Sequence, residues 1–474
     1  TILAGGALLS SSSFVAVSAA TTSSSTDRNE EGVNLRRELV ETAAPSSRSA
    51  PSDGSTSTSS PSVTSSESSK ASKVGQSSQT IYPDEARKHD ATWLMWPHPY
   101  TYGSMYRNEI EPMWVEMTKA LVDSGEPVVL VVYDEWIQDR ATNQLWQNSK
   151  IDTYEPSNQI TFHTIEYDDV WIRDVGPMFV LNENNKVEMI DWGFNGWGQS
   201  VRDYSLDNAV PLDAAYYLDM KLVDMTNVIL EGGAVEVDGR GTLIATESSI
   251  LENGRNRQLG WTQQQIENFF STNMGVSNTI WLDGRNGGTE DITDYHIDGF
   301  ARFANPTTIV TMNRANLLEW GISSKDVNTL YGAKGIDGTP FNFLYLPLTQ
   351  NNVVTTYGEN LGFKGSYTNF YTGNKVVMMP SYNDPNDAVA QRILQTAYPD
   401  RQVVLIDSRN AIKDGGMVHC VTKEQTTGMR EVMSARNRQM VDALSASGIP
   451  SSFKHKSVAA MVVAFSSFAA LLVL

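Results

Sequence analysis

Short apolar runs rich in Val, Ile and Thr recur along the middle of the chain, and segments with helical spacing lie between several of them. Runs of this composition are typical of buried strands. An alternation of strands with helices indicates an α/β protein. The expected strands cover 127–133, 178–181, 187–190, 228–230, 242–245, 307–312, 375–379 and 401–406, and the expected helices cover 113–123, 262–270, 388–397 and 431–444.

Glycine pairs punctuate this rhythm, for example at Gly232-Gly233 and Gly415-Gly416. A length of 474 residues would suggest about three domains at roughly 150 residues each. However, no long polar linker divides residues 82–444. The sequence therefore predicts one large α/β domain over that range.

The first 80 residues have the composition of a leader and a stalk. Residues 2–20 form an apolar stretch that ends in small residues, as in a secretory signal peptide, although a disordered apolar tail is the alternative. Residues 45–80 hold 20 Ser or Thr in 36 positions and cannot bury enough apolar area to order themselves. We expect a signal peptide over 1–20 and a disordered stalk over 21–80.

The end of the sequence has the pattern of a lipid-attachment signal. Small residues at 445–448 precede a polar spacer, and residues 458–474 are apolar or small. This order is typical of the signal for a glycosylphosphatidylinositol (GPI) anchor. A transmembrane helix is the alternative, although 17 residues is at the short limit for spanning a bilayer. Residues 445–474 are thus expected to direct a secreted protein to the cell surface, with the lipid anchor as its membrane contact.

Charge and cysteine content narrow the ligand class. The chain holds 36 Lys and Arg against 55 Asp and Glu, and residues 81–444 alone hold 48 acidic and 28 basic side chains. So acidic a unit argues against nucleic-acid binding, which needs a basic surface, and favours a cationic ligand. Cys420 is the only cysteine, which excludes an intramolecular disulfide and a structural zinc site built on several thiolates.

Cys420 itself lies in the segment GGMVHCVT (415–422). A buried structural cysteine is the commoner case, but the preceding glycine pair leaves the backbone room for a ligand. If residues 417–421 form a strand, His419 and Cys420 point to opposite faces. His419 is then a poor base for the thiol, and the base comes from elsewhere.

His296 is the candidate for that base. In an extended segment, Asp294, His296 and Asp298 share one face, which places the imidazole between carboxylates. A surface strand with satisfied polar groups is one alternative. A metal site is another, although it lacks further His ligands.

Asp174 lies in the segment WIRDVGP (171–177). A carboxylate can accept a bidentate pair of hydrogen bonds from a guanidinium, and the face of Trp171 can add a cation–π contact. Taken alone, this pattern is weak, because a tryptophan is more often structural.

Taken together, these segments resemble the agmatine deiminase and bacterial-type peptidylarginine deiminase family. The resemblance covers roughly 330 residues, from TWLMWP (92–97) to HCVT (419–422). The matching blocks are WIRDVGP (171–177), DWGFNGWG (191–198), LEGG followed by DGRGT (230–242), DITDYHIDGFARF (291–303), GSYTNFY (365–371) and GGMVHCVT (415–422).

The resemblance implies a fold and a site. The family has the pentein fold, a pseudo-fivefold α/β propeller of ββαβ-type units with the site in its central channel. Neither a metal nor an organic cofactor is implied, and the partner is a cationic guanidine or an arginine-containing peptide. By position, the resemblance makes Cys420 the nucleophile, His296 the general acid and base, Asp174 and Asp298 the carboxylates that grip the guanidinium, and Trp171 and Asn369 further substrate-binding residues.

These roles agree with the chemistry of a guanidinium. Its carbon is a poor electrophile because the charge is delocalised, and a thiolate near a cation is a suitable nucleophile at neutral pH. His296 would protonate the departing ammonia and later activate water. The implied reaction is hydrolysis through a covalent amidino-cysteine.

Departures from the family pattern concern the far end of the substrate. The segment 98–107 lacks the Asp-Asn-Trp-Arg-like sequence usual in agmatine-specific members, and Tyr295 stands where Gly is usual. Ala234 and Glu236 stand where Ser and His are common. These changes leave the guanidinium chemistry intact.

We expect deimination of agmatine to N-carbamoylputrescine, a step of putrescine and polyamine biosynthesis. Peptidylarginine deimination to citrulline is the close alternative, which the expected stalk and anchor suit better. Recognition of a free α-carboxylate would need a nearby arginine, and Arg202, Arg255 and Arg257 are candidates. An inactive surface-binding protein is a third alternative, against which the retention of the candidate site residues argues.

Overall fold

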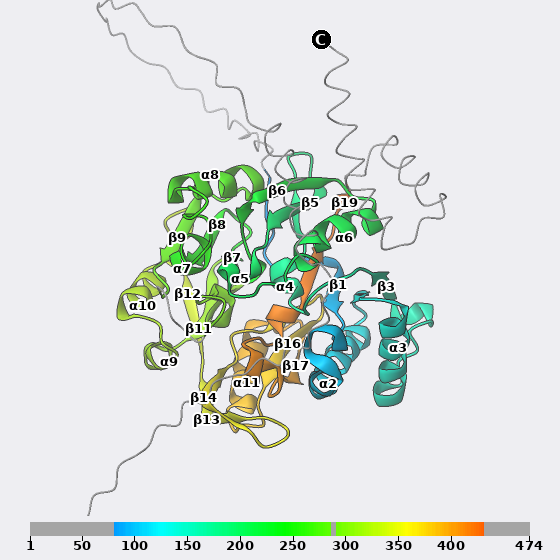
Figure 1. Cartoon of the computed structure of the whole chain (residues 1–474). Helices are drawn as coiled ribbons and strands as arrows, with labels where there is room; N and C mark the ends of the chain where they lie inside the picture. The colour runs from blue at the N-terminus through cyan, green and yellow to red at the C-terminus, as the bar shows by residue number, and fades with distance from the viewer. Residues whose placement is uncertain (1–79, 286–290, 431–474) are drawn as a thin grey trace, which may run out of the picture. The chain divides into compact units, whose positions relative to one another are not determined.

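The computed structural model describes residues 80–285 and 291–430 (Figure 1). The expected signal peptide at 1–20, the stalk up to residue 79, the helix expected over 431–444 and the tail at 445–474 lie outside the described residues. Within the part that is described, no helix is both long enough and apolar enough to cross a membrane.

Four consecutive modules of the described chain share one pairing pattern. The first two strands of each module are antiparallel neighbours, and the third pairs in parallel with the second after a helical connection. The modules are β4 (Met178–Leu181), β5 (Lys186–Gly193) and β6 (Leu222–Ile229); β7 (Val235–Val237), β8 (Thr242–Thr246) and β9 (Asn278–Leu282); β10 (Ala301–Asn305), β11 (Thr308–Met312) and β12 (Asn342–Leu346); and β15 (Tyr371–Thr372), β16 (Val376–Ser381) and β17 (Gln402–Asp407).

A fifth module has the same pattern but draws on both ends of the described chain. β1 (His89–Met95) pairs in parallel with β2 (Val128–Val132), which pairs with β3 (Ile160–Thr164). On its other edge β1 pairs antiparallel with β18 (Lys423–Thr426), and Trp93 lies opposite Lys423. The strand that follows Cys420 is thereby joined to the first strand of the described region.

Helices connect the second and third strands of the modules and lie toward the outside in Figure 1, whereas short helix α4 (Ile172–Val175) lies near the middle. Local signals fix several of their ends: Asp134 accepts from the Ile137 N–H at the start of α3, and Thr262 and Gln265 form a capping box at the start of α8. The other helices are α2 (Pro99–Ser124), α3 (Glu135–Ser149), α5 (Gly196–Gln199), α6 (Val210–Leu218), α7 (Glu247–Ile250), α8 (Gln263–Met274), α9 (Arg314–Glu319), α10 (Ser324–Tyr331) and α11 (Asp387–Ala397).

Two further strand pairs lie outside the pattern of these modules. The hairpin of β13 (Leu348–Val354) and β14 (Asn360–Ser366) lies between the module of β10 and that of β15 in sequence. β19 (Met429–Arg430) pairs in parallel with β5. The expectation of an α/β chain is therefore confirmed for the described residues, whose sheets combine parallel and antiparallel pairs.

The expected elements mostly coincide with observed ones. The strand expected at 178–181 is β4, and those expected at 242–245 and 401–406 are shifted by one residue at most from β8 and β17. The helix expected at 113–123 is only the second half of α2, and the strand expected at 228–230 is only the end of β6. In both cases most of the missed part is half-exposed or exposed and mixes apolar with polar residues, so that hydrophobic periodicity gives only a weak signal there.

Buried side chains gather in four apolar clusters between the sheets and their helices. Three tryptophans in the first cluster are fully buried, and each indole N–H finds an acceptor: Trp93 donates to Gln425, Trp96 to Glu111 and Trp114 to the Met95 carbonyl. Such partners offset the cost of burying an indole N–H. This cluster anchors β1 and therefore the position of β18 beside it.

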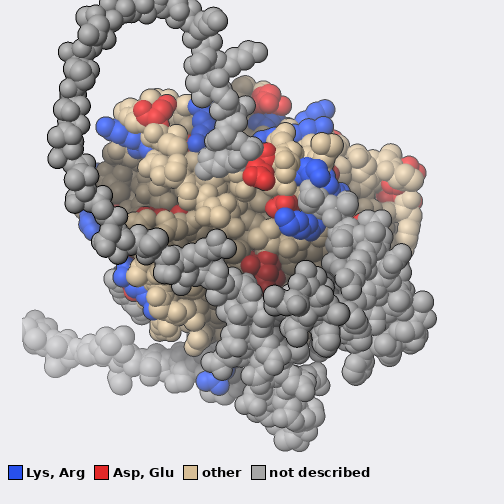
Figure 2. Space-filling model, turned by 90° about the horizontal axis from the view of Figure 1, so that it is seen from above, with Lys and Arg blue, Asp and Glu red and all other residues tan. Residues whose placement is uncertain are grey.

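Charged residues are mixed on the face shown in Figure 2, where Lys and Arg lie among Asp and Glu rather than in a separate patch. The acidic excess of the chain is thus not gathered into one uniform surface on that visible face. Several carboxylates are instead buried in the interior, where they surround the candidate site.

Candidate active site

The candidate site residues occupy one recurring place in the fold, the turn just before the first strand of each module. These turns contact one another although they are far apart in sequence. They are α4 with Asp174 before β4, the 3₁₀ helix Gly232–Ala234 before β7, the 3₁₀ helix Ile297–Gly299 with Asp298 before β10, Asn369 before β15, and the 3₁₀ helix His419–Val421 with Cys420 before β18.

Gly233 marks the point on which three polar side chains converge. A Cβ atom on this residue would lie 2.6 Å from His296 Nδ1, 2.8 Å from Asp174 Oδ1 and 3.0 Å from Asp298 Oδ2. Side chains cannot approach so closely, so a residue other than glycine would force these groups apart. Asp174, His296 and Asp298 therefore converge closely on the backbone of Gly233.

Asp174 is held by two neutral donors. The Trp197 indole N–H donates to Oδ2 at 2.9 Å and the Gly233 amide donates to Oδ1 at 2.9 Å. His296 Nδ1 lies 3.6 Å from Oδ1. Burial raises the pKa of Asp174, partly offset by the charge of His296. The carboxylate is thus oriented but not neutralised by a close ion pair.

His296 bridges two carboxylates. Its Nε2 lies 3.0 Å from Glu231 Oε2, and Glu231 in turn accepts from Arg255 Nε at 3.0 Å. Burial by itself would lower the pKa of His296, but the charges of Asp174 and Glu231 raise it to about 9. His296 is therefore a cation at neutral pH and can act as a proton donor.

Cys420 lies beside Asn369 and Asp298. Asn369 Nδ2 is 3.3 Å from Sγ, and Asp298 Oδ2 is 3.9 Å from it. Asn369 Oδ1 also accepts from the His419 amide at 2.9 Å, which fixes the turn that carries the thiol. Burial and the nearby charges of Asp298 and Asp174 raise the pKa of Cys420 well above its usual value. The free protein thus holds a thiol there rather than a thiolate.

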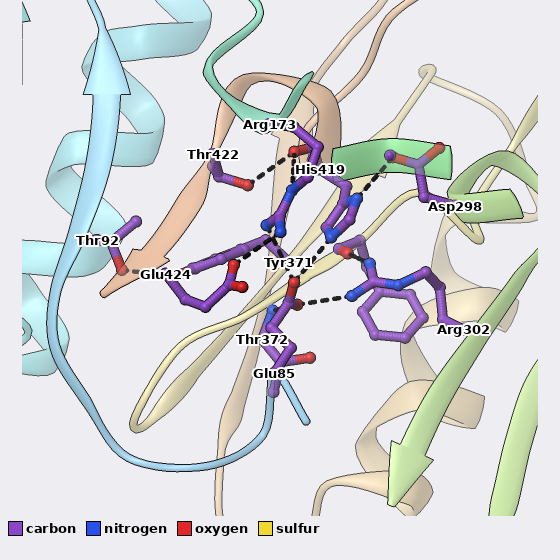
Figure 3. A network of polar contacts seen from close by, with 12 residues as sticks. Glu85, Thr92, Arg173, Asp298, Arg302, Tyr371, Thr372, His419, Thr422 and Glu424 are labelled. Carbon is purple, nitrogen blue, oxygen red and sulfur yellow. Dashed lines mark hydrogen bonds and ion pairs between the residues drawn. The ribbon is translucent and has the colours of Figure 1, made fainter. Parts of the chain in front are cut away.

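Asp298 is also paired with His419, through the same oxygen that faces the thiol. His419 Nδ1 lies 2.7 Å from Asp298 Oδ2, and His419 Nε2 lies 2.7 Å from Glu85 Oε2 (Figure 3). Burial would raise the pKa of Asp298, but the hydrogen bond and charge of His419 hold it below its usual range. Asp298 is therefore an ionised carboxylate in contact with the thiol.

Trp171 closes one side of the cysteine turn. Its Nε1 donates to Asp169 Oδ2 at 2.8 Å, and its ring lies flat against Gly416, where a Cβ would come within 1.8 Å of Cζ3. Gly416, the second glycine of the pair before Cys420, is thus needed for the close packing of this indole.

The model of the Porphyromonas-type peptidyl-arginine deiminase family matches residues 81–426 of this chain. The chain belongs to this family.

Relatives of this deiminase family agree with that assignment. The agmatine deiminase of Pseudomonas putida is 30% identical over 371 residues, which are 72% of this chain and 94% of that protein. The solved agmatine deiminase of Enterococcus faecalis is 24% identical, with a TM-score of 0.62, over 75% of this chain and 98% of that one. An agmatine deiminase of C. jejuni, solved with substrate bound, is 24% identical, with a TM-score of 0.61, over 74% and 98%.

The deiminase family consists of hydrolases that act on a C–N bond of a linear amidine, and the two solved structures share its mixed α/β fold with this chain. The expected membership in the deiminase family and the expected α/β fold class are thus confirmed. Among the residues that the structure describes, no group of three or more His, Cys, Asp or Glu is arranged to hold a metal ion.

Two local predictions about the deiminase site are wrong. Residues 417–421 are not a strand, because His419–Val421 is a 3₁₀ helix, and His419 and Cys420 both contact Asp298 instead of pointing apart. Residues 294–298 are not extended either, since Asp294 and Tyr295 have φ of 58° and 68°. Asp294 Oδ2 instead accepts from Arg255 Nη1 at 2.6 Å. Of the three residues expected on one face, only His296 and Asp298 face the site.

Four residues around the deiminase site were not identified as site residues from the sequence. Glu231 and Trp197 lie in the family blocks LEGG (230–233) and DWGFNGWG (191–198). Membership of these blocks is the sequence feature that could have identified them. Arg255 was considered for a substrate carboxylate, but it is fully buried and paired with Glu231 and Asp294. His419 was not identified because the strand expected over 417–421 would point its side chain away from Cys420.

Proposed function

We propose that this deiminase-family protein hydrolyses agmatine to N-carbamoylputrescine and ammonia, through a covalent amidino-cysteine on Cys420. The observation that carries the proposal is the convergence of the Asp174, His296 and Asp298 side chains on Gly233, with Asp298 also in contact with the thiol. Two carboxylates and one proton donor around a thiol are what a planar cation needs in order to be held and attacked.

Substrate binding would itself activate the thiol. In the free protein, burial and the two carboxylates hold the pKa of Cys420 high. A guanidinium between Asp174 and Asp298 neutralises those charges and brings a cation near the sulfur, which favours the thiolate. The proton leaves to solvent as the cation enters. The nucleophile is therefore formed chiefly in the presence of the correct substrate.

The remaining steps balance around His296. The thiolate attacks the guanidinium carbon, a C–S bond forms, and a C–N bond breaks as the His296 imidazolium gives its proton to the departing amine, which leaves as ammonia. Neutral His296 then takes a proton from water, which attacks the same carbon, and the C–S bond breaks. The hydroxyl proton of the adduct passes to the departing sulfur, so the products are a compound with a neutral ureido group, ammonia and the regenerated thiol, with one water consumed.

Agmatine is favoured by the relatives and by the charge of the chain. The Pseudomonas putida relative is named an agmatine deiminase, and agmatine carries a second positive charge that suits an acidic protein. Two candidates for a free carboxylate are already paired, because Arg255 binds Glu231 and Asp294, and Arg257 lies against Glu252. These pairings count against free arginine as the substrate.

The test is ammonia release by the full chain with agmatine, a blocked arginine peptide and free arginine side by side. Cys420→Ser is the control. The proposal predicts turnover of agmatine above both others and none in the variant. Higher turnover of the peptide would favour the alternative, protein-arginine deimination, which the expected stalk and anchor suit. If the wild-type protein releases no ammonia from any of the three, an inactive binding protein becomes the better interpretation.

We also propose that the five modules close into a pseudo-fivefold propeller. The common pairing pattern, the joining of β18 to β1, and the convergence of the turns before each first strand support this arrangement. Deleting residues 423–426 removes β18. A closed ring predicts that the whole domain then melts cooperatively at a lower temperature, whereas independent modules predict loss of one module alone.

A place at the cell surface is the third part of the proposal. It is supported by the small-residue site, spacer and apolar tail of residues 445–474 and by the Ser/Thr-rich stalk. Phospholipase cleavage specific for the GPI linkage should release the native protein from intact cells. Retention on the cells after cleavage, or an exclusively internal pool, would contradict it.

A further inference from the structure

His419 is a buried histidine next to the nucleophile that plays no part in the reaction steps above. It is 2% exposed and lies in the 3₁₀ helix that carries Cys420. Both of its ring nitrogens face carboxylate oxygens, Asp298 on one side and Glu85 on the other, each at 2.7 Å (Figure 3). A buried histidine clamped in this way fixes the geometry of whatever it touches.

The two contacts set the hydrogen-bonding role of the ring. An ionised carboxylate has only acceptor oxygens, so a nitrogen without hydrogen would meet it lone pair to lone pair. Both contacts are satisfied at once only when both nitrogens carry hydrogen. The ring is thus held as a donor to both carboxylates.

Glu85 is itself held ionised by two arginines. Arg302 lies 2.8 Å from Oε1, Arg173 lies 3.1 Å from Oε2, and the Thr372 amide donates to Oε1 at 2.7 Å. Burial would raise the pKa of Glu85, but Arg302 and His419 hold it well below its usual value. Because Glu85 keeps its charge, it can anchor the far nitrogen of His419.

A comparison within the site shows what this pairing does to Asp298. Asp174 receives only neutral donors within 3 Å, and burial raises its pKa. Asp298 is equally buried, but its direct contact with His419 brings its pKa below the usual range. The other charged groups that lower it, His296 and Arg302, have no recorded contact with its carboxylate. The two guanidinium carboxylates therefore differ chiefly by His419.

The contact also leaves one oxygen of Asp298 for a ligand. His419 takes Oδ2, and for the residues that are described no hydrogen bond to Oδ1 is recorded. Asn369 Nδ2 lies 3.4 Å from the Asp298 carbonyl and 3.3 Å from the thiol. His419 thus fixes Oδ2, the oxygen that also faces the thiol and Gly233, and within the described chain Oδ1 remains able to accept from a ligand.

We propose that His419 is a positioning residue of the deiminase site, which holds Asp298 ionised and correctly oriented for the substrate guanidinium. This inference rests on the proposed deiminase function. It also assigns a role to the segment before β1, because Glu85 completes the clamp from the opposite end of the described chain.

A matched pair of variants tests the proposal. His419→Asn places an amide N–H near the position of Nδ1 and retains a neutral donor toward Asp298, whereas His419→Gln places its amide toward Glu85 and abandons Asp298. Loss of a hydrogen bond to a buried charge predicts that KM for agmatine rises roughly tenfold to hundredfold in His419→Gln and less in His419→Asn. The acidic limb of kcat/KM, which reports groups of the free enzyme, should move to higher pH in both.

His163→Gln is the control, because His163 is also buried, stacks on Tyr217 and does not touch the site. It should leave KM and the acidic limb unchanged. A folded His419→Gln protein with wild-type KM and an unmoved acidic limb would overturn the proposal. If that variant does not fold, His419→Asn decides in the same way.

A second measurement separates failure of this inference from failure of the proposed function. Cys420 is the only cysteine, so its alkylation by iodoacetamide can be followed without turnover. Agmatine should slow alkylation in the wild type and protect His419→Gln at least roughly tenfold less well. Protection without ammonia release would contradict the function and still test His419. Equal protection in both proteins would overturn the role of His419, and absence of protection in the wild type would overturn both ideas.

Discussion

Replacing Gly233 by Ala puts a methyl group into the space where the guanidinium is expected. Gly233 has no positive φ, so alanine can adopt its backbone conformation without strain. The new Cβ would nevertheless lie 2.6 Å from His296 Nδ1, 2.8 Å from Asp174 Oδ1 and 3.0 Å from Asp298 Oδ2. The substitution therefore tests the site while leaving the chain path intact.

The size of the effect follows from these distances. To reach 3.4 Å, the start of ordinary contact, the three polar atoms would have to retreat by about 0.4 to 0.8 Å. Overpacking of this kind costs about 1–3 kcal/mol. Misplacement of reacting groups by about 1 Å can cost a factor of roughly 100 in rate. Because the methyl group also occupies the substrate space, we expect kcat/KM for agmatine to fall by at least roughly 100-fold.

The assay is steady-state ammonia release together with circular dichroism of each protein. Gly299→Ala is a matched control, since this glycine follows Asp298 in the 3₁₀ helix and a Cβ there would meet nothing within 4 Å. It should keep kcat/KM near that of the wild type. The reasoning is refuted if folded Gly233→Ala retains activity within about threefold of the wild type, or if Gly299→Ala loses as much activity as Gly233→Ala.

Three further outcomes are expected. Trp197→Phe keeps a ring but removes the N–H donated to Asp174, so KM should rise roughly tenfold, and an unchanged KM in substrate titrations would contradict this. Because the pKa of His296 is raised from 6.5 to about 9, the stability from its protonation is fully present below pH 6.5 and is lost as pH rises through about 9. The activity that needs the imidazolium should decline over the same upper range, which pH profiles and urea midpoints would check. Arg302→Met leaves the carboxylates of Glu85 and Glu236 without their common cation and should lower the free energy of unfolding by about 3–5 kcal/mol, whereas Lys325→Met, at an exposed ion pair, should change urea denaturation little.

The strands that could be predicted are those with long, buried, β-branched runs. β2 reads VVLVV and β17 reads QVVLID, and both stand out from their surroundings. β7 has only three residues and β15 only two, which is too short for any periodicity to show. Their positions depend on partners elsewhere in the chain, so the sequence could indicate α/β architecture but not the full set of strands.

The same limit applies to the site. Cys420 and His296 were accessible because few residue types can do their chemistry, and the chain holds one cysteine and six histidines. The local backbone was not accessible, because Asp294 and Tyr295 adopt positive φ, which is uncommon for such residues and is stabilised here by tertiary contacts. The wrong strand at 417–421 then hid His419, although it lies directly beside the nucleophile.

The pairing of β18 with β1 has a consequence for the biosynthesis of the protein. Glu85 and Cys420 are 335 residues apart, and the clamp through His419 needs both. At translation rates of roughly 5–20 residues per second, about 17 to 67 seconds separate their synthesis. Until the segment around Cys420 has emerged and β18 has docked, a growing chain has neither nucleophile nor complete site. The protein can thus modify a guanidine only after nearly all of its catalytic domain has been made, which spares the cell any activity from incomplete chains.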